Sequence, residues 1–276
     1  MKIPCYFFNA LVLLLLSVNA LADTTGDSAA KIEQLAKEAQ NPVAKLISVP
    51  FNNNFNFGEG YHRTTQYVLD IKPVVPFSLT EDWNLITRTI IPVISQPTTL
   101  TPNSRSYMSG LGDITPTVFI SPAKPGNILW GVGPAMTLPT ATNRQLGQGK
   151  YSLGPSFVVL SMPGHWVYGF LAYNLWSVGG QVKRDTVNQF QLQYFINYNF
   201  PRGWYLTTQP IITANWLAKA DDQWVVPLGL GLGRVFHVGK QALNMSFQAY
   251  DNVKTTATLG PQWQAQFNVS FLFPKS

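Results

Sequence analysis

Four charged residues stand near the middle of segments in which apolar and polar residues alternate: Asp70, Lys72, Arg88 and Asp113. Asp70 and Lys72 are out of phase with their apolar neighbours, so both side chains should point to one face of a strand. With a turn centred near Thr80, Lys72 would stand opposite Arg88, and Asp70 would lie diagonal to Arg88. Two neighbouring cations need carboxylates nearby to neutralise them, and Asp70 and Asp113 are the nearest candidates.

This charged group has two interpretations. It could form a constriction that selects or gates solutes, as rings of charged side chains do in channels. It could instead be an interior ion-pair network that fills space and fixes the register of the strands. We favour the network, and both interpretations place the four side chains in one interior.

A second set of candidate residues is uncharged. The stretch NQFQLQYFINYNF, residues 188–200, alternates aromatic or aliphatic residues with amides. We expect Gln189, Gln191 and Gln193 to line a confined interior, because amides can bond to one another and to water at a lower desolvation cost than unpaired charges. Phe195 is an aromatic residue on this same inner phase.

Catalytic and metal chemistry are not indicated. The single cysteine, Cys5, lies in a predicted export signal, so the mature chain would have no thiol. His62, His165 and His237 show neither metal-site spacing nor a serine–histidine signature. The repeat LGLGLG, residues 228–233, lacks the context of a phosphate loop, and its glycines would admit a bulky neighbour, a plug segment or a solute. We predict no enzyme activity, metal or cofactor.

The composition indicates a membrane environment. Only 12% of the 276 residues are charged, against about 25% in typical soluble domains. The net charge of +6 is scattered along the chain, which argues against nucleic-acid binding. Lys2, the apolar run after it and Ala20-Leu21-Ala22 predict a secretory signal peptide over residues 1–22.

Residues 23–45 form the most charged stretch of the chain. The segment 29–40 is rich in helix formers, Asp27 or Ser28 is a candidate N-cap, and the apolar face is weak. We predict a partly helical segment that is either a short periplasmic helix or a plug that enters a barrel. The sequence leaves both open.

Residues 46–276 have the period of β-strands. Apolar residues recur at alternate positions over about 10 residues at a time, longer than the usual strand of about 5–6 residues. In residues 166–176 both phases are apolar. Twelve such segments can be counted, over residues 47–57, 67–77, 83–93, 114–120, 128–138, 151–159, 166–176, 188–200, 204–216, 224–236, 243–249 and 263–273.

The links between these segments alternate in length. Tight links such as LTED, PAKPG and PRG alternate with longer ones at residues 96–107, 140–149, 177–185 and 251–260. All eight tryptophans fall at segment ends, as two aromatic girdles require, whereas a soluble β-sandwich would place them in mid-strand.

Strands can cross lipid only as a closed barrel, because every backbone amide must be paired internally. The predicted fold class is therefore all-β: a transmembrane, antiparallel, up-and-down β-barrel of about 12 strands with short periplasmic turns and longer outer loops. The apolar phase should face lipid, and the polar phase should face a polar, weakly cationic lumen.

Several segments together resemble a known family: QNPVAKLISVPFNNNFNFG, EDWNLITRTIIPVISQP, GLGDITPTVFISPAKPG, WGVGPAMTLPTAT, NYNFPRGWYLTTQPIITANW and FLFPK. They are similar to bacterial outer-membrane β-barrels described as transporters of the phenol-degradation meta-pathway type, often mislabelled neuromedin U. The resemblance spans residues 40–275. It implies transport of aromatic or hydrophobic compounds and supplies no site residues. Phe271 and Phe273 resemble the C-terminal aromatic signal that barrel-assembly machinery reads.

The sequence thus predicts a Gram-negative outer-membrane channel or transporter for the passive passage of small molecules. The expected partners are outer-membrane lipid, the barrel-assembly machinery during biogenesis and small-molecule solutes. A non-conducting structural or surface-interaction barrel is the alternative, and an outer-membrane enzyme is a weaker one. The sequence does not choose between a narrow pore and a plugged one, because a barrel of about twelve strands is intermediate in size between barrels filled by side chains and barrels that conduct water.

Overall fold

The structure is a computed structural model that describes residues 26–60, 62–98, 106–257 and 260–274. The predicted signal peptide lies outside these ranges. The described part contains one α-helix, α2 (Gly26–Ala39), and two short 3-10 helices, η2 (Pro201–Gly203) and η3 (Ala220–Asp222). Among the described residues, no helix has both the length and the apolar character needed to cross a membrane.

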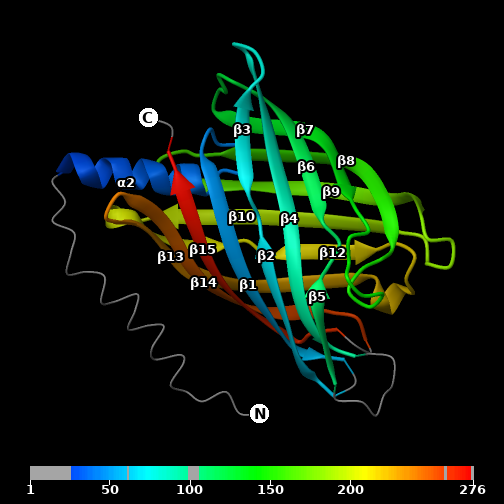
Figure 1. The fold of residues 1–276 in the computed structure, drawn as a ribbon. Coiled ribbons are helices and arrows are strands. Elements are labelled where there is room, and N and C mark those ends of the chain that lie inside the picture. The colour runs from blue at the N-terminus through cyan, green and yellow to red at the C-terminus, as the bar shows by residue number, and fades with distance from the viewer. Residues whose placement is uncertain (1–25, 61, 99–105, 258–259, 275–276) are drawn as a thin grey trace.

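Fifteen strand segments form one antiparallel sheet (Figure 1). They are β1 (Ile47–Glu59), β2 (Thr64–Ile71), β3 (Val74–Ser78), β4 (Trp83–Pro97), β5 (Tyr107–Leu111), β6 (Thr115–Pro122), β7 (Ile128–Thr137), β8 (Lys150–Ser161), β9 (Trp166–Gly180), β10 (Asn188–Asn199), β11 (Trp204–Thr208), β12 (Ile211–Asn215), β13 (Trp224–Val238), β14 (Gln241–Lys254) and β15 (Trp263–Phe273).

Three pairs of segments are halves of single strands. β2 and β3 both pair with β4, as do β5 and β6, while β11 and β12 both lie between β10 and β13. Pro73 and Pro210 stand at two of these interruptions, since proline has no N–H to donate to the ladder. The fifteen segments therefore make twelve strands.

The first and last strands close the sheet. β1 pairs with β15 in an unbroken antiparallel register from Ile47–Phe273 to Phe57–Trp263. With an even number of strands the closing pair must be antiparallel, as it is here. The prediction of a closed, antiparallel 12-strand β-barrel is confirmed. Short turns gather at one end of the barrel, here called the short-turn end (Figure 1). The other end, the long-loop end, carries the longer loops, together with the short link between β1 and β2.

Side chains alternate between the two faces of the barrel wall, as β10 and the residue that follows it, Phe200, show. Ile196 is 44% exposed and Phe200 is 40% exposed on the outer face, whereas Phe195 is only 4% exposed on the inner face. Aromatic side chains meet at both rims. The rings of Trp83 and Trp130 lie 5.9 Å apart near the short turns, and those of Trp216 and Trp224 lie 5.3 Å apart near the long loops.

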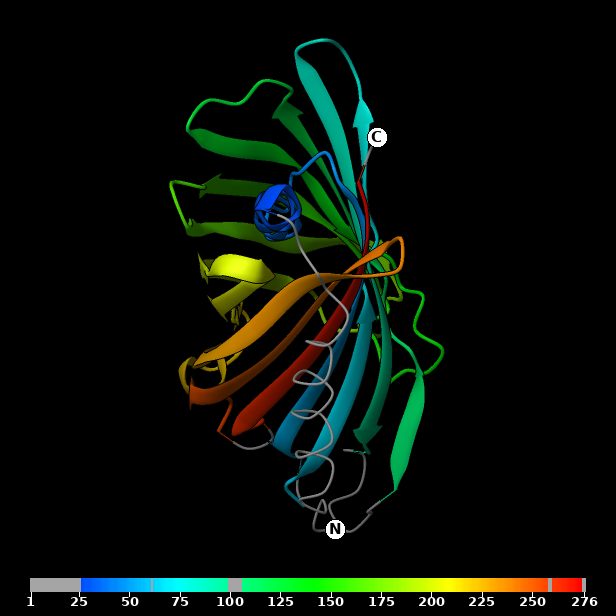
Figure 2. The ribbon, with the colours of Figure 1, turned by 90° about the vertical axis from the view of Figure 1, so that its left-hand side faces the viewer.

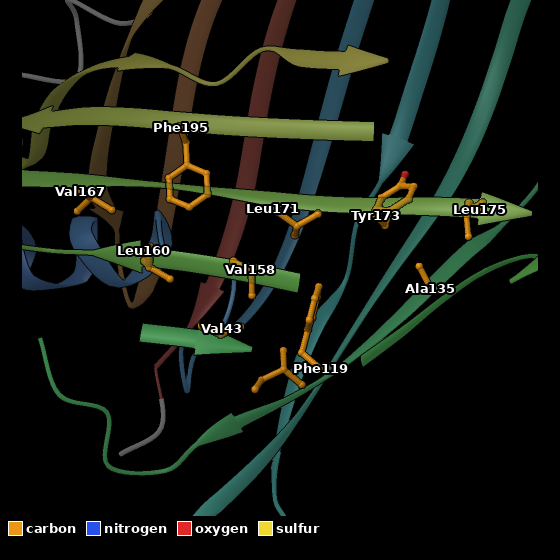
Figure 3. Packing of buried hydrophobic residues seen from close by; sticks show 11 residues of the cluster. Val43, Phe119, Ala135, Val158, Leu160, Val167, Leu171, Tyr173, Leu175 and Phe195 are labelled. Carbon is orange, nitrogen blue, oxygen red and sulfur yellow. The ribbon is translucent and has the colours of Figure 1, made fainter. Parts of the chain in front are cut away.

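The inner face is not polar throughout, which corrects the expectation of a polar lumen. An apolar cluster lines the inside of β4 and β6–β10 (Figure 3) and explains why both phases of residues 166–176 are apolar. We call it the apolar wall. It consists of Val43, Ile86, Phe119, Ala135, Val158, Leu160, Val167, Leu171, Tyr173, Leu175 and Phe195.

The helix α2 lies inside the mouth of the barrel at the short-turn end, where Figure 2 shows it nearly end-on among the strands. Leu35 and Ala36 are buried against inner-face residues of β11, β13, β14 and β15. The predicted N-cap is wrong, because the helix already includes Asp27 and Ser28.

The short turn η2 packs directly against α2. Gly203 has φ +75°, and a Cβ there would lie 2.6 Å from Cγ2 of Ile32. A side chain at this position would therefore be both strained and in collision with the helix. At the other end of α2, the side-chain amides of Gln40 and Asn199 bond to each other reciprocally, at 2.9 and 3.1 Å.

Candidate functional site: the barrel lumen

The lumen side opposite the apolar wall carries a continuous chain of side-chain hydrogen bonds. Tyr250 donates to Gln248 at 2.5 Å, Gln248 donates to Gln266 at 2.9 Å, and Gln266 donates to Asn54 at 2.7 Å. Asn54 in turn donates to Asp70 Oδ2 at 3.1 Å. Amides suit this position because each side chain can accept from one neighbour and donate to the next. We call this surface the amide wall.

The amide chain ends on the candidate charged group. Asp70 Oδ2 also contacts Lys72 Nζ at 3.1 Å. The side chains of Lys72 and Asp70 are 6% and 16% exposed, so this ion pair is largely removed from solvent. Lys72 lies at the β2–β3 interruption, where its backbone N–H still bonds to the carbonyl of Pro50 on β1.

Arg88 does not stand opposite Lys72, so that expected pairing is wrong. Arg88 pairs with Val74, because the turn after β3 is centred near Glu81 rather than Thr80. The residue is 8% exposed, and its Nη1 has no hydrogen-bond partner among the described residues. Its electrostatic neighbours are Asp70, Lys72 and Tyr173.

Asp113 serves a different purpose from the other three charged residues. It lies at the β5–β6 interruption, where Oδ1 accepts the N–H of Ala141 at 3.1 Å and Oδ2 accepts the N–H of Gln148 at 2.6 Å. The carboxylate therefore ties the loop 138–149 to the inner face of the barrel. Leu146 of this loop is 5% exposed, and the carbonyl of Gln145 accepts a bond from Gln96 on β4.

The three glutamines of β10 each have a polar partner. Gln189 accepts from Gln148 of the loop at 2.7 Å, and Gln191 accepts from the hydroxyl of Tyr173 at 2.7 Å. Gln193 donates to the carbonyl of Gln209 at 3.5 Å, a long bond. Sequence reasoning missed Tyr173 as a partner, because its place among apolar residues gave no sign of one.

Two cavities follow one another along the lumen. The outer cavity, at the long-loop end, has a volume of about 470 Å³ and is lined by Gln189, Gln191 and Tyr173. The inner cavity has a volume of about 130 Å³ and is lined by Gln193 and Arg88. Gln191 and Gln193 are successive inner-face residues, so the boundary between the cavities falls between them. Residues around α2 form part of the inner cavity.

One glycine of the repeat LGLGLG makes room for a bulky neighbour. A Cβ at Gly233 would collide with the ring and hydroxyl of Tyr205 on the adjacent strand. Tyr205 is 2% exposed and donates to Asn244 at 2.6 Å. Of the three interpretations of these glycines, room for a neighbouring side chain applies at this position.

The histidines form no catalytic or metal-binding group within the described ranges. His165 contacts Glu33 of α2 at 3.1 Å, a link between the helix and the rim of the barrel. No group of three or more histidine, cysteine, aspartate or glutamate residues in that part of the chain could hold a metal ion.

No family model matches the sequence, and no curated protein matches it. Among solved structures, the COG4313 outer membrane channel from Pseudomonas putida F1 is similar, with a TM-score of 0.60 and 15% identity over 83% of this chain and 94% of that one. The NanC porin gives a TM-score of 0.48 and 12% identity over 83% of this chain and 100% of that one. Outer membrane phospholipase A from Escherichia coli gives a TM-score of 0.42 and 12% identity over 87% of this chain and 98% of that one.

These identities are low, so the first similarity shows the fold, and the two weaker ones add nothing to it. The chain shares with that protein the fold of a closed, antiparallel 12-strand β-barrel.

Proposed function

We propose that this protein is an outer-membrane channel through which small molecules pass passively. The observation that carries the proposal is the pair of cavities that follow one another along the interior of a closed barrel, between the amide wall and the apolar wall. A barrel that served only as a scaffold would gain stability from filling this space. The similarity in fold to an outer membrane channel supports the same role.

The proposal includes a location and an orientation. Residues 1–22 would direct export, and residues 46–276 would form the barrel in the outer membrane of a Gram-negative bacterium. The short-turn end would face the periplasm. Phe271 and Phe273, which are 38% and 43% exposed on the outer face of β15, would serve the barrel-assembly machinery.

The solutes we propose are small aromatic or hydrophobic compounds. The family resemblance suggests this class, and the apolar wall supports it, since the wall offers a path of low desolvation cost to an apolar body. The amide wall would hydrate polar groups of the same solute. We propose no catalytic step.

Residues 23–45 would be a plug at the periplasmic mouth. The support comes from α2, whose Leu35 and Ala36 bury against the inner face of the barrel, and from Val43, which reaches the apolar wall. The channel described here would then be in its restricted state.

Conductance in planar bilayers tests the function. We expect small, discrete current steps from the full chain and larger ones from a variant that lacks residues 23–40. The matched control replaces Gln34 and Lys31, both exposed on α2, by alanine and should conduct like the full chain. No current and no solute uptake into liposomes, from either the full chain or the deletion variant, would exclude the channel.

A non-conducting barrel remains the second candidate, because α2 and the apolar wall occupy much of the lumen. The two candidates predict opposite results for the deletion variant. A silent deletion variant that is folded, as judged by its migration on an unheated gel, would establish the structural role.

A further inference from the structure

Two cations line the inner cavity, and among the described residues only one of them, Lys72, has a carboxylate within ion-pair distance. Lys72 is 5% exposed and Arg88 is 8% exposed, and both side chains line this cavity. Asp70 is bonded to Lys72 and to Asn54, which accounts for one of the two cations. Glu38 lines the cavity from α2, where it accepts a bond from Gln34, and it forms no ion pair with Lys72 or Arg88 among the described residues.

Arg88 is therefore a buried guanidinium without a carboxylate of its own. Its Nη1 has no hydrogen-bond partner among the described residues. Buried polar groups are nearly always bonded, and a buried charge is costly unless it is paired. A guanidinium presents donors in a planar fork that matches the two oxygens of a carboxylate.

The cavity has an apolar side next to these cations. Phe195 lines it and is 4% exposed, and Val74, which pairs with Arg88 across the strands, lines it as well. Phe195 belongs to the apolar wall. A solute in this position would meet a fixed cation on one side and an apolar surface on the other.

We propose that the inner cavity is a binding site for a small carboxylate with an apolar body, in which Arg88 receives the carboxylate, Lys72 adds a second positive charge and Phe195 packs against the body. The proposal rests on the channel function and names its substrate class.

Basic residues at the long-loop end fit the same class of solute. Arg144, Lys183 and Arg184 line a cavity of about 270 Å³ that also includes Asp185 and adjoins the outer cavity through Gln148 and Gln189. The two carboxylates that line the outer cavity accept backbone N–H groups. Asp113 binds those of Ala141 and Gln148, and Asp222 binds that of Ala257. An anion would therefore meet cations at the mouth and again at the inner cavity.

Calorimetric binding of benzoate to the full chain in detergent tests the site without requiring conduction. We expect benzoate to bind at least about tenfold more tightly than benzamide, its neutral analogue, and Arg88→Gln to remove most of that difference, because charge-assisted bonds are roughly twice as strong as neutral ones. Arg88→Lys should keep part of it. The matched control is Lys240→Gln, an exposed cation in the turn between β13 and β14, which should bind like the wild type.

Two results would overturn the site: equal binding of benzoate and benzamide, or equal effects of Arg88→Gln and Lys240→Gln. If Arg88→Gln does not fold, Lys72→Gln and Phe195→Ala are measured instead, and unchanged benzoate binding in both would refute the proposal. Conductance in planar bilayers, measured on the same protein, separates this failure from that of the channel. A conducting protein without benzoate binding keeps its function and loses the site, whereas benzoate binding without conductance keeps the site and refutes the channel.

Discussion

Replacing Leu35 by alanine should release α2 from the mouth of the barrel. Leu35 is 7% exposed and packs among Tyr205, Val235 and other inner-face residues. A released helix would expose this side chain to water, so the substitution removes nearly its whole burial energy from the docked state. At about 0.8 kcal/mol for each buried methylene-sized group, the loss is roughly 2–3 kcal/mol, at the low end of the range for Leu→Ala.

Since about 1.4 kcal/mol corresponds to a factor of ten, the released population should rise roughly 30- to 140-fold. Trypsin can report this change, because α2 contains Lys31 and Lys37 and cleavage of a transiently opened segment follows its population. The control is Gln34→Ala, which removes an exposed bond to Glu38 worth a few tenths of a kcal/mol, about 0.3. If Leu35→Ala and Gln34→Ala are cleaved at the same rate, α2 is not held by its buried face and the account of the mouth is wrong.

Three further substitutions test other parts of the barrel. Gly233→Ala should lower the thermal stability of the folded barrel by about 1–3 kcal/mol, because the new methyl group collides with Tyr205 and overpacking costs that much; an unchanged melting temperature would contradict this close approach. Asp113→Ala removes two bonds from backbone N–H groups of the loop 138–149; trypsin should then cleave faster after Arg144, which is exposed on this loop, while the strands stay intact. Leu230→Arg places a charge on an outer-face residue that is 61% exposed, and refolding into lipid vesicles should become less favourable by about 2–4 kcal/mol, whereas refolding equal to that of Leu230→Ala would deny that this face meets lipid.

The strands and their outer faces could be predicted because lipid favours an apolar side chain at each outward-facing position, which gives the sequence its period of two. The inner face follows no such rule. Leu171 on β9 and Gln248 on β14 both point inward, and only the neighbours that the closed barrel supplies decide which type of residue fits. Tertiary contacts of this kind cannot be read from a period of two.

The outer face has its own exception. Asn53 lies on the outer phase of β1, where it accepts a bond from the hydroxyl of Tyr67 at 2.8 Å and donates to the carbonyl of Phe267 at 3.2 Å. The amide also donates to the carbonyl of Phe51 at 3.4 Å. Tyr67 and Phe267 lie on the two neighbouring strands, so the alternation within β1 alone could not show that they satisfy this amide.

Errors in the candidate site arose from turns and interruptions. A shift of the turn centre by one residue moved Arg88 from Lys72 to Val74. Asp113 has both oxygens occupied by a loop 28 and 35 residues further along the chain, which no local pattern reveals.

The seam between β1 and β15 has a consequence for how the barrel is made. It joins residues that are distant in the sequence, such as Asn53 and Phe267, which are separated by 214 positions. Until β15 is in place, both β1 and β14 present an open edge of unpaired backbone groups, and such edges pair readily with other chains. Contacts of this sequence separation also form late, because the loop entropy must be overcome first. Substitutions in β15 should therefore act mainly during assembly, by prolonging the time for which the edges are open, and much less on a barrel that has already closed.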